Sequence, residues 1–489
     1  MHNNNRWQKL DGEDGKDENI TKLCDLPDGI VQKILSDLPT KEAVATSVLS
    51  KSWVHKWTGI NKIDLELLDE VAPEKRQQFI DFVEKLRVFC NTSSLKKFSL
   101  FFEVGMEAPR VTKWLSIFVN PNIEELKLEL YTVKEPLVLS DQFFTSEKLT
   151  KFELSMSQVI KLPSTINFQN LVTLTLKHVI FPNYYCTTEF FLSLRSLKEM
   201  TLIDCNWKKV GTIIITCPLL QKLFIRDWKD HDDEDDHHDN EEEVEEELAE
   251  ELNNDVNDIT AVENLNYHHG LIRILSNELV SFTYDGDLMN DYSLFYTFSV
   301  SNATIKLHEQ HNNMLHAGHF IYKLFIALSG VTKLSVSDFA LQALCQPLLL
   351  AAHLPLFFNL VKLRVTSPSA VDLSCEGLHS LLRNSPFLEK IEFKEGITLA
   401  ANGGNLINPL PGCFWTKLKV IKIYDFCGSD GELNAIKFLL QETLVLDTLY
   451  IQYNESHFDS PEGTKMLDML LEQIYEFPKA SMDCDIEVE

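Results

Sequence analysis

The sequence predicts an α/β protein of 489 residues, in which a long repeat array follows a small helical module and ends in an α/β cap. The main observation is a recurring pattern: an apolar residue, any two residues, an apolar residue, any residue, and an apolar residue. Helical apolar spacing near the amino end and alternating strand-like and helix-like segments near the carboxyl end are the other two. Together they predict a solenoid with a parallel concave sheet and with helices or loops outside.

The first segment, residues 1–22, is polar and acidic and lacks the apolar core of a signal peptide, so we expect a disordered N-terminus. The most apolar stretch, residues 344–360, is interrupted by two prolines and a histidine and is too short to span a bilayer. The ten cysteines form no C-x-x-C pair and no disulfide framework. We therefore expect a protein of the cytoplasm or nucleus with reduced thiols.

Residues 23–62 predict three short helices. Pro27 fits a first helical turn, Pro39 ends the first helix, and Thr40 and Ser50 are the expected N-caps of the next two. The apolar positions are Leu26, Ile30, Ile34, Leu35, Leu38, Val44, Val48, Leu49, Trp53 and Trp57. So small a unit cannot bury all of these side chains internally, and a remaining apolar face predicts a docking surface for another protein.

This segment resembles an F-box of the plant type. The resemblance is carried by Leu26-Pro27, by the run ILSDLPTKEAV, and by SVLSKSW with a second Trp four positions later. It implies binding to the Skp-family adaptor of a cullin-RING ubiquitin ligase. Ser52 departs from the pattern, in which Arg is usual, so the surface expected to bind the adaptor has one cation fewer. The adaptor contacts that the resemblance implies are Leu26, Pro27, Ile30, Ile34, Leu35, Leu38, Val48, Leu49 and Trp53. The alternative is an apolar helical hairpin that packs on the repeats.

The recurring pattern occurs thirteen times and predicts a leucine-rich-repeat solenoid over residues 63–410, continuing into the cap. The instances begin at residues 95, 123, 149, 171, 197, 220, 279, 300, 331, 360, 388, 418 and 446. Apart from one step of 59 residues, the steps of 21–31 residues lie in or just beyond the leucine-rich-repeat range. Residues at the fourth and sixth positions share one side of a strand, and stacked strands bury them in a continuous core. The alternative is an ordinary sheet protein with Leu-rich strands.

The 59-residue step contains an acidic insertion, residues 229–260, together with one or two repeats. Residues 230–258 contain 17 Asp or Glu and no Lys or Arg, in a chain whose formal net charge is −28. Such a run predicts disorder because like charges repel and little is apolar. We weigh two interpretations, a lure for a basic partner and a tolerated loop insertion. The negative charge also argues against nucleic acid or membrane as partners.

Residues 411–489 predict the order strand, helix, strand, helix, strand, with helices expected over 432–441 and from Pro461 through Tyr475. The segment resembles the FBD domain that follows the repeats in plant F-box proteins. The residues that carry the resemblance are Leu418, Ile421, Ile423, Phe426, Gly428, Glu432, Leu433, Lys437, Phe438 and Leu439, with the tail Phe477-Pro478-Lys479-Ala480-Ser481. We expect this module to close the open strand edge of the array.

The sequence contains no recognisable catalytic or cofactor motif. His308, His311, His316 and His319 have a spacing that a zinc site could use, but no Cys or carboxylate completes the usual structural pattern. Histidines on the surface of one helix and loop are the favoured interpretation. We therefore expect no catalytic residue, no metal and no cofactor.

In a leucine-rich solenoid the third and fifth positions of each pattern face the concave side. They hold the cations Lys97, Lys127, Lys151, Lys222, Lys333, Lys362, Arg364, Lys390 and Lys422. They hold the anions Glu125, Glu153, Glu199 and Glu392, and the aromatics Phe224 and Tyr450. Nine cations against four anions favour an acidic or phosphorylated partner, which the acidic insertion could compete with by folding back. The alternative is that the lysines only solubilise an exposed sheet.

The resemblance and the residues together predict a substrate-recognition subunit of a Skp–cullin–F-box ubiquitin ligase. The N-terminal module would bind the adaptor, and the repeats and cap would bind a target protein and bring its lysines near the ubiquitin-charged enzyme. The alternative is a repeat scaffold for protein–protein interaction that serves no ligase. The sequence does not identify the target, any small-molecule co-ligand or the biological process.

Overall fold

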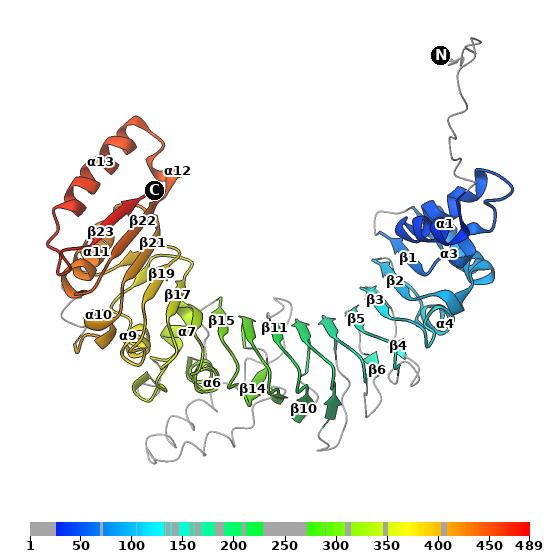
Figure 1. Ribbon diagram of the computed structural model, residues 1–489, viewed down its shortest axis with the longest axis horizontal. Coiled ribbons are helices and arrows are strands. Elements are labelled where there is room, and N and C mark those ends of the chain that lie inside the picture. Colours follow the sequence, from blue (N-terminus) through cyan, green and yellow to red (C-terminus); the bar gives the residue numbers. More distant parts are fainter. Residues whose placement is uncertain are drawn as a thin grey trace, which may run out of the picture.

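The main feature of the computed structural model is a 15-stranded parallel sheet in the order β1-β2-β3-β5-β7-β9-β11-β13-β15-β16-β17-β19-β21-β22-β23. The structure describes residues 26–68, 72–103, 105–131, 133, 137–138, 146–156, 160–161, 168–180, 190–207, 212–227, 271–288, 290–308, 314–345, 351–401 and 408–489. The sheet lines the inner side of an open arc, with the N-terminal helices at one end and the C-terminal module at the other (Figure 1). No helix among the described residues is long and apolar enough to cross a membrane.

The sheet strands are β1 Lys62–Leu67, β2 Lys97–Phe102, β3 Glu125–Leu130, β5 Lys151–Met156, β7 Thr173–Lys177, β9 Glu199–Ile203, β11 Lys222–Asp227, β13 Ser281–Gly286, β15 Asn302–Leu307, β16 Lys333–Ser337, β17 Lys362–Thr366, β19 Lys390–Phe393, β21 Val420–Phe426, β22 Thr448–Tyr453 and β23 Asp485–Val488. The outer strands are β4 Leu137–Val138, β6 Ile160–Lys161, β8 Phe190–Ser193, β10 Thr212–Thr216, β12 Leu271–Leu275, β14 Asp291–Phe295, β18 Val371–Asp372 and β20 Ile397–Thr398.

The α-helices are α1 Asp28–Asp37, α2 Thr40–Ala45, α3 Pro73–Phe89, α4 Ala108–Phe118, α6 Met314–Ala327, α7 Asp338–Ala343, α9 Glu376–Arg383, α10 Gly412–Thr416, α11 Asp430–Glu442, α12 Glu455–Phe458 and α13 Pro461–Tyr475. Short 3-10 helices are η2 Thr46–Val48, η3 Lys56–Gly59 and η4 Thr92–Ser94. The α-helices from α3 to α11 and the outer strands form the convex side of the arc (Figure 1).

All thirteen instances of the repeat pattern form strands of the main sheet, as predicted, including the weak instance at residue 300. Neighbouring strands pair in register, so that the third position of one repeat lies beside the third position of the next, as Lys333, Lys362 and Lys390 do. The fourth and sixth positions, such as Leu363 and Val365, are fully buried. Stacking therefore buries one side of every strand, and the leucine-rich solenoid is confirmed.

One sheet strand and much of the convex side were not predicted. β1 carries the same pattern from Ile60 onward, where the segment assigned to the helical module, residues 23–62, ends. Behind the middle of the arc, β14, β12, β10 and β8 form a second parallel sheet where helices or loops were expected. The convex side is thus strand-built in its middle and helical toward both ends.

The acidic insertion interrupts the array without adding a strand to the main sheet, because β11 pairs directly with β13. The 59-residue step therefore contains one repeat. Asp227, the last residue of β11, accepts hydrogen bonds from the backbone and side-chain nitrogens of Asn290, at 3.1 and 3.0 Å. Burial raises the pKa of Asp227 to about 7. The residues on both sides of the insertion are thus held together by the fold, and the insertion itself lies outside the described residues.

The C-terminal module has the predicted order of strand, helix, strand, helix, strand, formed by β21, α11, β22, α13 and β23, with α12 between β22 and α13. Ser429 caps α11 in a capping box with Glu432, whose carboxylate accepts from the Ser429 backbone at 2.9 Å. Pro461 opens α13, as expected. The module extends the main sheet rather than covering its edge, because β23 is the final strand and pairs in parallel with β22.

Candidate partner-binding surfaces

The N-terminal module leaves several apolar side chains exposed. On α1, Val31 and Leu35 point into the core, whereas Ile30 and Ile34 remain 49% and 41% exposed. The exposed set continues after α2. Together, Ile30, Ile34, Val48, Leu49 and Val54 form what we call the docking face. An exposed apolar cluster of this kind is typical of a surface that another protein covers.

The structure divides the residues predicted to contact an adaptor. Pro27, Ile30, Ile34, Val48 and Leu49 are exposed, and Leu26 and Leu38 are half-buried. Leu35 and Trp53 are only 1% and 5% exposed, so in this structure they support the docking face from inside and are not part of it. Val54 belongs to the docking face but was not predicted, because only Trp53 and Trp57 were selected as the apolar positions of this segment.

The docking face is attached rigidly to the first strand of the main sheet. Thr40 is not an N-cap, since Pro39 occupies that position. Its buried hydroxyl instead accepts the backbone N–H of Asp64 in β1 at 2.7 Å. The third helix expected after Ser50 is a turn followed by η3, and Trp57 of η3 is buried. The Gln32 side chain donates to the Lys56 carbonyl at 2.9 Å and so ties α1 to η3.

The concave face carries the second set of predicted residues, and the structure places all of them on it. They are Lys97 on β2, Lys127 on β3, Lys151 on β5, Lys222 and Phe224 on β11, Lys333 on β16, Lys362 and Arg364 on β17, Lys390 on β19, and Lys422 on β21. Each side chain lies on the side of its strand opposite the buried residues, which confirms their orientation. Whether they bind a target is not tested by this placement.

In the N-terminal part of the sheet, these cations pair with carboxylates on the same or neighbouring strands. Lys97 lies 2.8 Å from Glu125. Lys222 lies 2.7 Å from Glu199, and Lys127 lies 3.1 Å from Glu129. Because these three positive charges each have a negative charge beside them, they offer little net attraction to an anion.

In the C-terminal part, three cations share one carboxylate. Glu392 is 3% exposed and lies 2.8 Å from Lys362, 3.0 Å from Lys390 and 2.9 Å from Arg364. Burial alone would raise the pKa of Glu392, but hydrogen bonds from the three cations outweigh it and lower the pKa to about 2. Glu392 is therefore ionised at neutral pH, and its single charge leaves this group of cations with an excess of two.

Further cations surround this group. Lys394 lies over the ring of Tyr424 at 3.6 Å, and Lys422 lies over the ring of Tyr450 at 4.2 Å. Lys333 has no carboxylate within 4.0 Å among the described residues, and neither has Lys306 of β15. We call Lys306, Lys333, Lys362, Arg364, Lys390, Lys394 and Lys422 the cation cluster. Lys306 and Lys394 occupy the seventh position of their repeats, which shares the face of the third and fifth and could have been included by parity.

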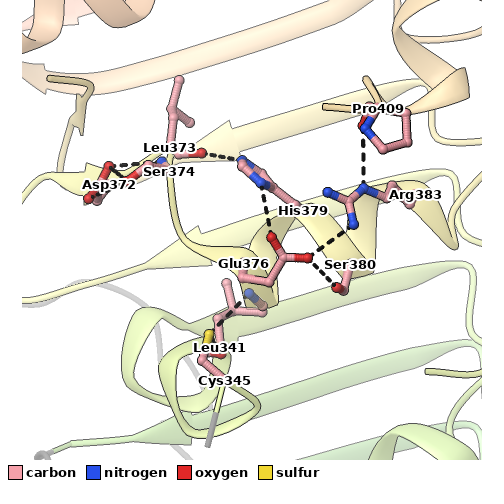
Figure 2. A network of polar contacts seen from close by, with 11 residues as sticks. Leu341, Cys345, Asp372, Leu373, Ser374, Glu376, His379, Ser380, Arg383 and Pro409 are labelled. Atoms are coloured by element: carbon pink, nitrogen blue, oxygen red, sulfur yellow. Dashed lines mark hydrogen bonds and ion pairs between the residues drawn. The ribbon is translucent and has the colours of Figure 1, made fainter. Parts of the chain in front are cut away.

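Behind the cluster, α9 is held by a network of polar contacts (Figure 2). Arg383 donates to the Glu376 carboxylate at 3.0 Å and to the Pro409 carbonyl at 3.3 Å. The buried His379 ring contacts the same carboxylate and the Leu373 carbonyl. The Gly377 N–H donates to the Cys345 sulfur at 3.2 Å, where α9 and α7 approach so closely that a Cβ on Gly377 would lie 2.0 Å from the Leu341 oxygen. The strands that carry the cluster thus rest on a fixed outer layer.

The structure places no group of three or more metal-ligating side chains together among its described residues. Of the four neighbouring histidines, His308 contacts Asp285 at the end of β13 and His319 lies half-buried on α6. His311 lies outside the described residues, and the side chain of His316 is not described. The two surfaces above therefore offer binding geometry, and we find no constellation on them that would carry out a reaction.

Comparison with known proteins assigns the N-terminal module. Residues 23–62 match the family model of the F-box domain. The chain is 28% identical to F-box protein At3g59000 of Arabidopsis thaliana over 508 residues, covering 96% of this chain and 94% of that protein. It is 23% identical to putative F-box/FBD/LRR-repeat protein At3g59240 of the same plant, covering 95% and 89% of the two chains. It is also 23% identical to FBD-associated F-box protein At4g13985 from that plant, covering 96% of each.

These matches confirm the resemblance to plant F-box proteins with leucine-rich repeats. The chain contains an F-box domain, and over most of its length it is homologous to F-box/LRR-repeat and FBD-associated F-box proteins of Arabidopsis thaliana. The F-box domain indicates a role in F-box-mediated protein interaction. The FBD boundary at residue 411 stays a prediction.

Proposed function

We propose that this protein is the substrate-recognition subunit of a Skp–cullin–F-box ubiquitin ligase in the cytoplasm or nucleus. The observation that carries the proposal is the docking face, whose apolar side chains are exposed on a module that is otherwise packed against β1. Covering such a face with a partner removes apolar surface from water, which is the main favourable contribution to most protein associations.

The proposed mechanism needs no reactive side chain in this chain. The F-box holds the Skp-family adaptor, and the adaptor links the protein to the cullin-RING ligase. The concave sheet holds a target protein. Fixing the target near a ubiquitin-charged enzyme raises the effective concentration of its lysines, which accelerates transfer through proximity.

Binding to a purified Skp-family adaptor tests the proposal, with the full chain immobilised and the adaptor in solution. The variant Ile30→Asp/Ile34→Asp places two charges on the docking face, where an apolar partner surface would have to desolvate them. We expect adaptor binding to fall at least a hundredfold, while the melting temperature changes little because both side chains are exposed.

The matched control is Lys33→Asp/Asp37→Lys on the same helix, which changes exposed polar positions and should leave binding nearly unchanged. If the unaltered chain does not bind the adaptor, the ligase assignment is wrong, and a repeat scaffold without ligase function becomes the better interpretation.

A further inference from the structure

Charge is distributed unevenly along the concave face. The outward positions of β1 to β13 hold seven cations, Lys62, Lys97, Lys127, Lys151, Lys177, Lys222 and Arg226. The same strands hold seven carboxylates, Asp64, Glu66, Glu125, Glu129, Glu153, Glu199 and Asp285. The outward positions of β15 to β21 hold the seven members of the cation cluster and one carboxylate, Glu392. The first part of the face is neutral, and the second has a net charge of +6 by this count.

The cation cluster also has an abrupt boundary on its carboxyl-terminal side. Toward the carboxyl end, β22 adds no charge at these positions, and β23 places Asp485 and Glu487 beside Thr448 and Tyr450. Tyr450 donates to the Glu489 carboxylate at 2.6 Å. A strongly positive strip thus lies between a neutral surface and a negative edge, which favours an anionic partner of limited length.

We propose that the cation cluster binds an extended, Asp/Glu-rich segment of the target protein, about six residues long. This inference rests on the proposed function, since the segment belongs to the protein that the ligase selects. The five strands β15, β16, β17, β19 and β21 are adjacent in the sheet. At about 4.8 Å between neighbouring strands they span about 19 Å, which an extended chain crosses in about six residues.

The geometry around Glu392 prepares the cluster for such a segment. The buried carboxylate draws Lys362, Lys390 and Arg364 toward one point, so less side-chain entropy is lost when an anion arrives. Tyr424 and Tyr450 hold Lys394 and Lys422 in the same way on the far side. A polypeptide carboxylate fits a face lined by half-buried tyrosines and by ammonium and guanidinium groups.

Fluorescence anisotropy with the full chain tests the inference. The probe is a fluorescein-labelled peptide with six alternating Glu and Asp residues between glycines, and its neutral counterpart has Gln and Asn instead. We expect the acidic peptide to bind, the neutral one not to bind, and affinity to fall steeply between 50 mM and 300 mM salt.

The decisive variant is Lys333→Gln/Lys422→Gln, which removes two cluster cations that have no carboxylate partner among the described residues and so leaves folding intact. We expect affinity to fall about five- to tenfold. The matched control, Lys97→Gln/Lys222→Gln, removes two lysines of the neutral part of the same face and should change affinity less than twofold.

Equal affinities of the two variants would overturn the inference. So would failure of the acidic peptide to bind both the full chain and a variant without residues 230–258, or clear preference for a phosphoserine peptide or a single-stranded oligonucleotide of equal charge. Adaptor binding measured on the same samples separates the two proposals. A chain that binds the adaptor but not the acidic peptide refutes only the target class.

Discussion

Glu392 shows how one buried carboxylate organises its surroundings. Its pKa, lowered to about 2 by the three cations, means that the folded state binds this proton less readily than the unfolded chain, whose Glu has a pKa near 4.5. The resulting stability is fully present above about pH 5 and is lost as the pH falls through 4 toward 2.

We expect Glu392→Gln to lower the free energy of unfolding at pH 7 by about 2 kcal/mol, since a buried partner of three cations is removed. Urea unfolding of both proteins between pH 7 and pH 3 measures this, and the difference should shrink as the pH falls. Glu125→Gln is the control, because Glu125 is well exposed and its pair with Lys97 contributes less than about 1 kcal/mol. A pH-independent difference would contradict this account.

At the residue scale, the sequence shows which side chains are apolar but not which of them the fold buries and which it leaves exposed. Ile34 and Leu35 are adjacent, and only the packing of α1 against η3 and β1 decides that Leu35 is buried and Ile34 is exposed. The same limit applies to charge. The third-position lysines were predicted to face the concave side, but the seventh-position residues Glu129 and Lys177, which pair with Lys127 and Glu153, were left out of that prediction.

At the scale of secondary-structure elements, the contact between α2 and β1 joins the N-terminal module to the sheet. β1 is the first strand of the sheet, and Thr40 supplies an acceptor for one of its edge N–H groups. An edge strand with unpaired backbone groups is a site of non-native pairing, and the N-terminal module covers part of this edge.

We expect Thr40→Val to lower the free energy of unfolding by about 1–2 kcal/mol, because the Asp64 N–H loses its partner while the side-chain volume hardly changes. Thr40→Ser keeps the hydroxyl and should recover most of this stability. Denaturant unfolding of the three proteins provides the comparison. If valine destabilises the protein no more than serine does, the hydrogen bond to the Asp64 N–H contributes little to stability.

Strands of the main sheet were predictable because each buries one side completely, which imposes the alternation of apolar residues. The outer strands were not. β10 has three consecutive isoleucines in the sequence TIIIT, β12 has apolar residues on both sides of Arg273 in LIRIL, and neither strand belongs to a pattern with a recurring spacing. The start of α13 at Pro461 was predicted, whereas the Ser429 cap of α11 was not, and the cap expected at Thr40 was wrong because its hydroxyl binds a strand 24 residues away.

On the scale of the whole molecule, the acidic run and the cation cluster are opposite charges in one chain. The charge of residues 230–258 leads to the hypothesis that this run competes with an acidic target for the cluster. Deleting them should raise the affinity of the acidic peptide about threefold or more at low salt, with a smaller gain at high salt because screening weakens both interactions.

The measurement is the same anisotropy titration, and its control must remove the negative charge while keeping the length of the chain. A variant with the 17 acidic residues replaced by Asn and Gln therefore serves as the control. It should match the deletion. Unchanged affinity in both would remove the competition and leave a loop insertion without influence on this face.

The order of the large parts was predictable from the sequence, because a repeat array depends mainly on contacts between neighbouring repeats. The separation of the concave face into a neutral and a positive part could not be predicted from the third and fifth positions alone. It requires the seventh position and the pairing of consecutive strands, which only the folded chain provides.

The regular spacing of the parallel strands also sets the distance between the docking face and the cation cluster. Each strand adds about 4.8 Å to the path along the sheet, and 15 strands make about 67 Å from β1 to β23. Gain or loss of a single repeat between the two surfaces would move the cation cluster by about 4.8 Å relative to the F-box and would leave both surfaces intact. Under the proposed function, an array with a different number of repeats would then hold an acidic target segment at a different distance from the adaptor.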